Sequence, residues 1–553
     1  MIRLLSLVLA LFALAVIPAA RADERGFLMF GGTIYVSPVG GAANRPEALV
    51  VRGEKIVFTG SLTAARAKAR GLPEIDLKGA VAYPGFIDSH VHLTGVGLRE
   101  MTLNLDQVTS LAQLTHALHA WDAAHPGEGP IVGRGWIETH WPEGRFPTRA
   151  DLDAVVPGRV VVLERADGHA VVLNTAALQL AGIDASTLDP IGGRIERDAE
   201  GQPTGMLIDT AAGLIEKRLP QLTMETRAEA LRKAVELYAA RGWTTAVNMS
   251  TSADDLRALF ALAADGKLPI RVDVFMIPED SAEVLERGPY ADPTGRVRVR
   301  GVKLYMDGAL GSRGAALLKP YTDRPDTSGL LIAQHRPTLA ILRQALKVKA
   351  QIAFHAIGDR GNRLVLDWFE EAIGDDRDAA RGLYWRVEHA QILDVCDIPR
   401  FASLGIVASM QPSHAIGDLY FAPSRLGPNR LEGAYAWRSL IDRVATVVFG
   451  TDAPVEVGDP RIEFYAAVTR KDLLGRSGPD WHLEQAIPRD AALTAFTITP
   501  NKVGGGDCGV LVQSCPADIT VFSGDILTIP NADILKVKPL LTVVAGRIVH
   551  DGR

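Results

Sequence analysis

Eight short runs rich in β-branched and aromatic residues recur along the chain, and they limit its fold more than any other feature. They begin at residues 85, 243, 270, 298, 351, 384, 405 and 444, with amphipathic stretches such as "RAEALRKAVELYAARG" between them. Parallel strands need crossover helices, and eight such strands close into a barrel without edges. The pattern therefore predicts an α/β protein with a (β/α)₈ TIM barrel.

The spacing of these runs predicts an insertion. Most runs begin about 20 to 55 residues apart, as βα units require, but the first and second are separated by about 150 residues. The surplus, about residues 100–224, has its own strand-like and turn-like segments. Because it follows the first barrel strand, we expect a subdomain at the barrel face where active sites of this fold lie.

Both ends of the remaining chain contain short alternating runs broken by Gly and Pro, such as "EALVVRGEKIVFTGS" and "LLTVVAGRIVHDG". Runs of this kind are typical of small antiparallel sheets. We therefore predict one small β-sandwich-like domain built from residues 23–82 and 505–553, with the barrel and its insertion at 83–504.

The first barrel run, "GFIDSHVHL", places Asp88, His90 and His92 at alternate positions. Alternate side chains of a strand face the same side, which at the end of a barrel strand is the barrel mouth. A single core histidine is usually structural, but two imidazoles at this spacing favour a metal clamp.

Later runs end in further candidate ligands: His355 after "QIAF", His389 after "YWRVE" and Asp452 after "VVFGT". Imidazole and carboxylate ligands suit zinc, with manganese, iron or nickel as alternatives. Lys303, in "RGVKLYMDG", lies near the end of the fourth run. Beside metal ions its ammonium is expected to be neutral, displaced or converted to a carbamate by CO₂, whereas a lysine without a metal role would reach solvent or pair with Asp307.

From about Gly31 to its C-terminus the chain resembles the amidohydrolase superfamily, specifically the YtcJ-like branch of amidohydrolase family 3. The motifs that carry the resemblance include "PGFIDSHVHL", "FHAIGDRGNRLVLD", "VKLYMDGALGSR", "VEHAQIL" and "FGTDAPVE". The resemblance implies a metal-bearing TIM barrel with a small β domain formed from both ends of the chain.

The resemblance also implies a division of the ligands. His90 and His92 would hold the more buried metal with Asp452, and His355 and His389 would hold a second. Lys303 matches the position that is carbamylated in binuclear members. One or two divalent ions, zinc above all, are therefore the expected cofactor.

The function expected from this site is hydrolysis of a C–N bond in an amide, N-acyl or N-formyl compound by metal-activated hydroxide. Asp452, beside the water, would act as catalytic proton shuttle to the leaving nitrogen. Two alternatives stay open: hydrolysis of a cyclic amide, ester or lactone at the same site, and a non-catalytic binding or regulatory protein.

Three residues of the insertion are candidate substrate contacts: Trp136, Arg165 and His169. The segment "ERADGHAVVLN" resembles the family's "R-x-DGH" motif. His169 would either position the substrate carbonyl or bond to a turn without touching substrate.

The first residues, "MIRLLSLVLALFALAVIPAARADERG", combine a basic start, an apolar core and a small-x-small pattern. This predicts a signal peptide, residues 1–22, cleaved after Ala22, and hence a secreted or periplasmic protein with no membrane attachment after cleavage. The alternative is an uncleaved membrane anchor. Cys508 and Cys515 would either pair in an exported protein or remain free thiols.

The charge of the chain narrows the class of partner. A net charge of −6 with no basic block argues against binding to nucleic acid or anionic membrane surfaces. A small-molecule substrate is the expected partner, and the sequence leaves open whether the protein forms a homo-oligomer.

Overall fold

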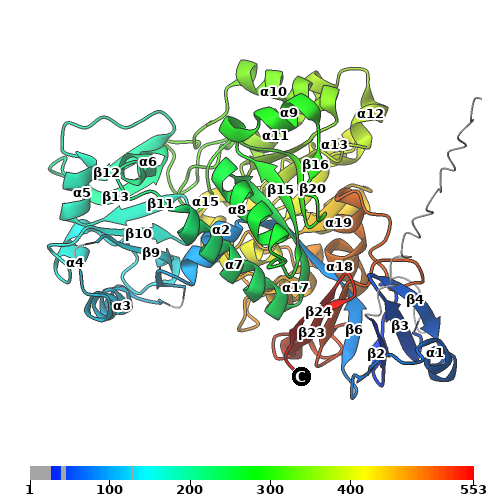
Figure 1. Ribbon diagram of the computed structural model, residues 1–553. Coiled ribbons are helices and arrows are strands. Elements are labelled where there is room, and N and C mark those ends of the chain that lie inside the picture. The colour runs from blue at the N-terminus through cyan, green and yellow to red at the C-terminus, as the bar shows by residue number, and fades with distance from the viewer. Residues whose placement is uncertain (1–25, 39–44, 107, 128) are drawn as a thin grey trace, which may run out of the picture.

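The computed structural model describes residues 26–38, 45–106, 108–127 and 129–553. The predicted signal peptide, residues 1–22, lies outside the described residues. The described part forms three regions: a central barrel, an insertion on one side of it, and a β domain on the other (Figure 1).

The barrel has eight parallel strands, whose order around the sheet follows the chain. A bridge between Val91 and Ala453 connects the last strand to the first and closes the barrel. Every run predicted from the sequence forms one of these strands, so the predicted fold class is confirmed. The strands are β7 (Phe86–Val91), β14 (Trp243–Thr251), β15 (Arg271–Met276), β17 (Val297–Tyr305), β18 (Gln351–Ala356), β19 (Arg386–His389), β20 (Val407–Met410) and β21 (Thr446–Phe449).

Helices surround the barrel and bury its outer face. Helix α7 (Met224–Arg241) shows how the sequence sets their ends: the Thr223 hydroxyl accepts the amide of Thr226, and Gly242 ends the helix with a φ of 103°. The others are α2 (Leu93–Arg99), α8 (Ala253–Ala264), α9 (Ala282–Arg287), α10 (His335–Val348), α11 (Asp359–Ile373), α12 (Arg377–Arg381), α13 (Ile398–Leu404), α14 (Pro412–Asp418), α15 (Ala422–Leu426), α16 (Trp437–Asp442), α17 (Pro460–Thr469), α18 (Arg489–Phe496) and α19 (Ile498–Val503). A short strand, β16 (Tyr290–Ala291), pairs with β17.

The insertion follows the first barrel strand, as predicted, and forms a six-stranded sheet of its own. Its core packs around Leu114, Trp136 and Leu163, separate from the barrel core. The sheet order is β12 (Gly193–Arg197), β13 (Pro203–Asp209), β11 (Ala170–Leu173), β10 (Val161–Arg165), β9 (Ile131–Trp136) and β8 (Leu103–Asn104); the helices are α3 (Leu111–Ala124), α4 (Arg149–Asp153), α5 (Thr175–Ala181) and α6 (Gly213–Glu216).

The β domain contains strands from both ends of the chain. Its two sheets share one apolar cluster, in which Met29 and Leu49 of one sheet pack with Ile519 and Val543 of the other. One sheet has the order β4 (Lys55–Gly60), β3 (Ala48–Arg52), β1 (Gly26–Phe30), β5 (Glu74–Asp76); the other has the order β2 (Thr33–Ile34), β6 (Val81–Pro84), β22 (Ile519–Phe522), β23 (Pro539–Val544), β24 (Arg547–Asp551). Helices α1 (Leu62–Lys68) and α20 (Asn531–Ile534) complete it. The exact domain boundaries remain a prediction.

Cys508 and Cys515 form a disulfide with Cα atoms 5.8 Å apart, so the alternative with two free thiols does not hold in this structure. Cys396 is free and exposed. None of the helices in the described ranges has the length and apolar character needed to span a membrane.

Candidate active site

The barrel brings the predicted ligands to one end of its strands. His90 and Lys303 lie near the ends of β7 and β17, His355 and His389 lie near the ends of β18 and β19, and Asp452 follows β21. The parallel register places Tyr305 opposite His355 and Ala356 opposite His389, so these strand ends are level. All the predicted ligands therefore meet at the barrel mouth.

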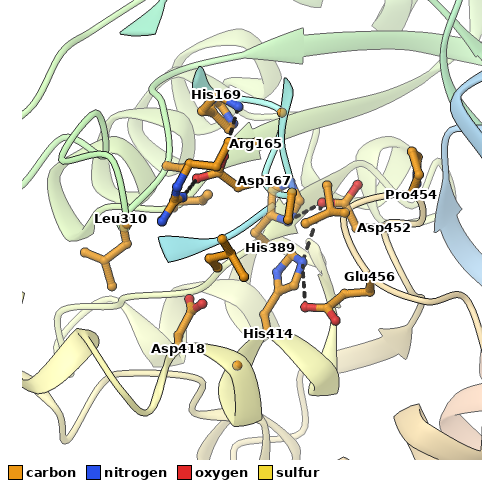
Figure 2. Close-up of a pocket in the computed structure, with 18 of the residues that line it drawn as sticks. Arg165, Asp167, His169, Leu310, His389, His414, Asp418, Asp452, Pro454 and Glu456 are labelled. Carbon is orange, nitrogen blue, oxygen red and sulfur yellow. Dashed lines mark hydrogen bonds and ion pairs between the residues drawn. The ribbon is translucent and has the colours of Figure 1, made fainter. Parts of the chain in front are cut away.

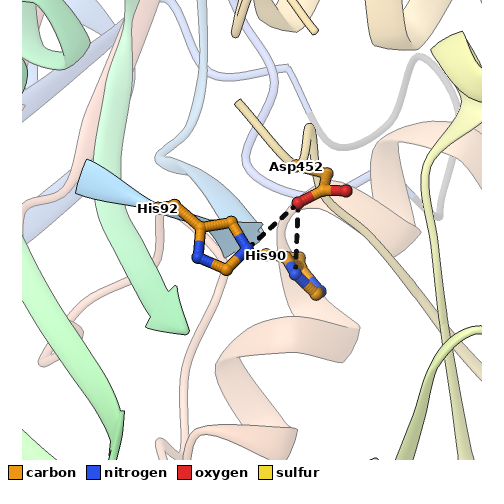
Figure 3. Close-up of side chains that lie close together, drawn as sticks. All are labelled: His90, His92 and Asp452. Carbon is orange, nitrogen blue, oxygen red and sulfur yellow. Dashed lines mark ion pairs between the residues drawn. The ribbon is translucent and has the colours of Figure 1, made fainter. Parts of the chain in front are cut away.

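His90, His92 and Asp452 form the first group with metal-ligand geometry (Figure 3). The Nε2 atoms of His90 and His92 each lie 3.3 Å from Oδ1 of Asp452. The other ring nitrogen of His90, Nδ1, lies 2.6 Å from Oε2 of Glu388. A carboxylate at Nδ1 holds the proton there and leaves the Nε2 lone pair facing the site, as in metal-bound histidines. Burial lowers the pKa of His90 to about 4, which keeps the ring neutral and able to bind a metal.

Lys303 lies against this group. Its Nζ is 3.5 Å from Nε2 of His90, and the side chain is buried. Burial lowers the pKa of Lys303 to about 8, although the charges of Glu388 and Asp452 act in the opposite direction. A lysine with a lowered pKa has a larger neutral fraction, which is the form that reacts with CO₂.

His355 and His389 are packed together beside the first group, with ring centroids 4.6 Å apart. Nδ1 of His389 lies 2.8 Å from Oε1 of Gln411. Nε2 of His355 is buried without a hydrogen-bond partner, and the nearest carboxylate oxygen, Oδ1 of Asp307, is 3.6 Å away. A buried ring nitrogen without a partner fits a metal that the ring would bind.

His414 belongs to the site, and the sequence analysis missed it. It lies in α14, directly after the segment that contains β20, and its Nε2 is 3.6 Å from Oδ2 of Asp452. With His389 and Asp452 it forms a second group of potential ligands, and its Nε2 also has no hydrogen-bond partner. The expected pair of His355 and His389 is therefore joined by a third imidazole. The rule that found the other ligands, a histidine at the end of a barrel run, would also have found His414.

His169 enters the site from the insertion, where it is held by a carboxylate. Its Nδ1 lies 2.8 Å from Oδ1 of Asp209, and its ring centroid is 5.6 Å from that of His355. Burial opposes its protonation, but Asp209 raises the pKa of His169 to about 9 and Asp167 adds to this. Gly308 and Gly314 leave room for the carboxylate, since a Cβ at Gly314 would lie 2.5 Å from Oδ2 of Asp209. His169 therefore offers a charged donor at the barrel mouth.

Arg165 lines the same pocket but is already paired. It is 1% exposed, its Nε lies 2.8 Å from Oε2 of Glu138, and it also forms an ion pair with Asp167. Two carboxylates neutralise this guanidinium, so its charge is not free for an anionic substrate.

Trp136 does not reach the pocket. Its side chain is fully buried in the core of the insertion, where its Nε1 donates to the carbonyl of Leu163 and its ring packs near Trp141 and Phe146. The expectation that Trp136 contacts substrate is therefore corrected to a packing role.

The pocket lies between the insertion and the barrel mouth (Figure 2) and has a volume of about 480 Å³. Cavities of this size hold small molecules. Arg165, Asp167 and His169 line it from the insertion, opposite the barrel residues. The barrel residues on its wall include His92, Lys303, His355, His389, His414 and Asp452.

Comparison with known proteins identifies the family. YtcJ of Bacillus subtilis is 34% identical over 94% of this chain and 98% of its own. N-substituted formamide deformylase of Arthrobacter pascens is 27% identical over 91% of this chain and 95% of its own. The crystal structure of an uncharacterized metal-dependent hydrolase from Pyrococcus horikoshii superposes with a TM-score of 0.74 at 29% identity, covering 92% of this chain and 99% of that one. The model of the amidohydrolase family matches residues 73–550, and the chain belongs to this family.

Proposed function

We propose that the protein is an exported, metal-dependent amidohydrolase that cleaves the C–N bond of a small amide, N-acyl or N-formyl compound. One observation carries the proposal: two groups of potential metal ligands share Asp452 at the mouth of a closed barrel. Membership of the amidohydrolase family supports hydrolase activity. The name of the Arthrobacter pascens relative supports an amide, and specifically a formamide, as the substrate class.

The residues that would hold the metal are His90, His92 and Asp452, with His389 and His414 as the second group and Lys303 and His355 beside them. Zinc is the favoured ion for this nitrogen and oxygen ligand set. When bound, the metal would activate water and polarise the scissile carbonyl. Lys303, if carbamylated by CO₂, would add an anionic oxygen ligand to this set.

The protein's own residues would perform the proton transfers. Asp452 lines the pocket, and its Oδ2 lies 3.6 Å from Nε2 of His414, so Asp452 is placed to accept a proton from the attacking water and to pass it to the leaving nitrogen. His169, held by Asp209, is placed to donate to the substrate oxygen as negative charge develops there. Glu388 keeps the His90 ring in its orientation.

Export is part of the proposal. It rests on the signal-like residues 1–22 and is supported by the disulfide, since such bonds persist in oxidising compartments. The test is where the full-length chain is found after expression and whether its N-terminus then begins at Asp23.

Metal content and hydrolysis test the enzymatic part together. Protein beginning at Asp23 would be compared with the Asp452→Asn variant and with the His90→Ala/His92→Ala double variant. We expect one or two metals per chain, a sharp fall in the double variant, and release of amine from a panel of formamides and acetamides. Loss of the proton shuttle in Asp452→Asn should reduce kcat by about 10² to 10⁴-fold.

The panel also separates the alternatives. Faster turnover of esters, lactones or cyclic amides than of open amides would assign the same site to those substrates. If metal-replete protein cleaved none of these compounds, the hydrolase proposal would be wrong, and a binding or regulatory role would replace it.

A further inference from the structure

The proposed hydrolysis gives no role to Gln391, a buried side chain on the pocket wall. It follows His389 by two residues in the motif "VEHAQIL". The residue is 4% exposed and lines the pocket. A side-chain amide has two N–H donors and one carbonyl acceptor, and each of these groups needs a partner when it is buried. The hydrogen bonds within the protein therefore decide which group a ligand could use.

Both N–H donors of Gln391 are used within the protein. Nε2 lies 2.7 Å from Oδ2 of Asp418 and 2.8 Å from the hydroxyl of Tyr435. The Tyr435 hydroxyl donates its own proton to the same Oδ2, so it accepts from Nε2. A carboxylate accepts hydrogen bonds, so the NH₂ group and not the carbonyl oxygen must face it. Asp418 and Tyr435 together fix the orientation of this amide.

The carbonyl oxygen of the amide, Oε1, is left without a partner. No donor in the part of the chain that the structure describes forms a hydrogen bond with Oε1 of Gln391, whose two side-chain bonds both involve Nε2. A buried acceptor without a partner costs free energy, so a water or a ligand is expected beside it. Oε1 is therefore the polar atom that Gln391 offers to a donor in the pocket.

The backbone around Gln391 is held as firmly as its side chain. The main-chain carbonyl of Gln391 accepts the N–H of Tyr435 at 2.6 Å, and buried Arg470 donates to the carbonyl of Tyr435 at 2.8 Å. The two residues before Gln391, His389 and Ala390, have φ angles of 74° and 42°. Residues other than glycine rarely adopt this left-handed conformation, and such strain gathers at functional sites. The protein thus fixes Oε1 before a ligand binds, which lowers the cost of binding.

Gln391 is connected to the part of the pocket where the leaving nitrogen would be protonated. Its partner Asp418 lies four residues after His414 in α14, so the two side chains share one face of that helix. Both lie on the barrel side of the pocket (Figure 2). Nε2 of His414 is 3.6 Å from Oδ2 of Asp452, the proposed proton shuttle. The amine half of a bound amide would therefore extend from Asp452 towards Gln391.

We propose that Gln391 is a specificity-determining residue whose Oε1 accepts a hydrogen bond from the amine half of the substrate. The inference rests on the proposed amide hydrolysis and narrows its substrate class to amides with a hydrogen-bond donor in that half. The donor is either the N–H of the cleaved bond or a hydroxyl or N–H on the amine substituent. A compound without it would leave Oε1 unpaired, and binding sites reject such compounds for this reason.

Two matched pairs of amides test the two donors. N-benzylacetamide and N-benzyl-N-methylacetamide differ in the N–H of the cleaved bond, whereas N-(2-hydroxyethyl)acetamide and N-(2-methoxyethyl)acetamide differ in a donor on the substituent. Hydrolysis by metal-replete protein gives kcat/KM for each, and calorimetry on metal-free protein gives affinities that do not depend on turnover. We expect the donor-bearing member of one pair to exceed its partner by about tenfold or more in both measurements. That pair identifies the donor.

Variants of Gln391 separate its contribution from the general shape of the pocket. Gln391→Met keeps a side chain of similar length without the acceptor, and the preference for the donor should fall to about threefold or less. Tyr435→Phe keeps the acceptor but removes one of the two partners of Nε2, so the preference should fall less. Gln351→Met is the matched control, because Gln351 is also buried but donates to the carbonyl of Val503 and does not line the pocket.

The inference would be overturned if Gln391→Met kept the preference, or if Gln351→Met lost it equally. A lower metal content in Gln391→Met but not in Gln351→Met would also overturn it, because the effect would then come from the metal site. If Gln391→Met did not fold, Tyr435→Phe would decide alone, and an unchanged preference in that variant would count against the inference.

The two measurements separate the two proposals. Hydrolysis of all four amides without a preference for a donor in either pair would overturn the role of Gln391 and leave the hydrolase proposal standing. If no amide were hydrolysed but metal-free protein still bound a donor-bearing amide about tenfold more tightly, and Gln391→Met lost this difference, the binding role would stand and the proposed reaction would fall.

Discussion

Glu388 contacts both His90 of the metal-ligand group and the buried Arg386. Its replacement by Gln therefore tests the surroundings of the ligands while leaving every proposed ligand in place. The carboxylate is fully buried, lies 2.6 Å from Nδ1 of His90, and forms an ion pair with the buried Arg386. Burial acts to raise the pKa of Glu388, but Arg386 and then His90 hold it well below its ordinary value. The negative charge of Glu388 therefore pairs with Arg386 and also orients the His90 ring.

Two separate losses are expected in Glu388→Gln. Removing one charge of a buried ion pair leaves Arg386 uncompensated and costs about 3–5 kcal/mol of folding stability. Weakening the partner that orients a ligand typically costs about 10 to 100-fold in metal affinity. Because the pKa of Glu388 is depressed, its contribution to stability is present above its ordinary value of 4.5 and is lost as the pH falls. The difference between the two proteins should therefore narrow in acid.

Denaturant unfolding of metal-free protein measures the first loss, and competition with a chromophoric chelator measures the second. Glu370→Gln is the control, because this partly exposed residue pairs with Arg377 and Arg400 near the surface, where ion pairs contribute about 0–1 kcal/mol. If Glu388→Gln changed stability no more than Glu370→Gln and left metal affinity intact, the role assigned to the buried pair would be refuted.

Three further predictions concern other parts of the chain. Burial lowers the pKa of His169, but Asp209 raises it to about 9, and Asp209→Asn should remove that partner. The loss of stability in this variant should be greatest below about pH 6.5 and should vanish above about pH 9. Denaturant midpoints measured across that pH range check this. Trp136→Ala should destabilise the insertion by about 3–5 kcal/mol through an unfilled core, measured by unfolding, and Trp136→Phe should cost less; equal effects of the two would contradict a packing role. Replacing both Cys508 and Cys515 by Ser should lower the free energy of unfolding by about 2–3 kcal/mol, as expected for a disulfide that closes so short a loop. Metal content should not change, because neither cysteine is among the proposed metal ligands. A fall in bound metal would refute this expectation.

The barrel was predictable because its strands are short, apolar and separated by helices of sufficient length. The strand at Phe86–Val91 is buried throughout and ends at the ligands, as the run "GFIDSHVHL" indicates. Parallel strands buried on both faces give continuous apolar runs, which are recognisable in a single sequence. The ligand positions followed from the same geometry, since side chains at the ends of such strands must meet at one face.

The direction of the Trp136 side chain could not be predicted from the sequence. Strand β9 alternates between buried and less buried positions up to Arg134, which would turn Trp136 away from the core. Gly135 has a φ of 114°, and the pairing with β10 shifts its register at this point, with Arg165 opposite Trp136. The break in the alternation turns the indole inward. A local backbone irregularity of this kind leaves no signature beyond a glycine, so the facing of this side chain could not be read from the motif.

The sequence also could not predict how the ligands are divided between two metals, because this division depends on which oxygen of Asp452 faces which imidazole rings. The family resemblance implies that Asp452 belongs to the first site with His90 and His92. In the structure Oδ1 of Asp452 faces these two rings, while Oδ2 lies 3.6 Å from Nε2 of His414 and 4.0 Å from Nδ1 of His389. A carboxylate has two oxygens and can serve two groups at once, so the two candidate sites are coupled through this residue.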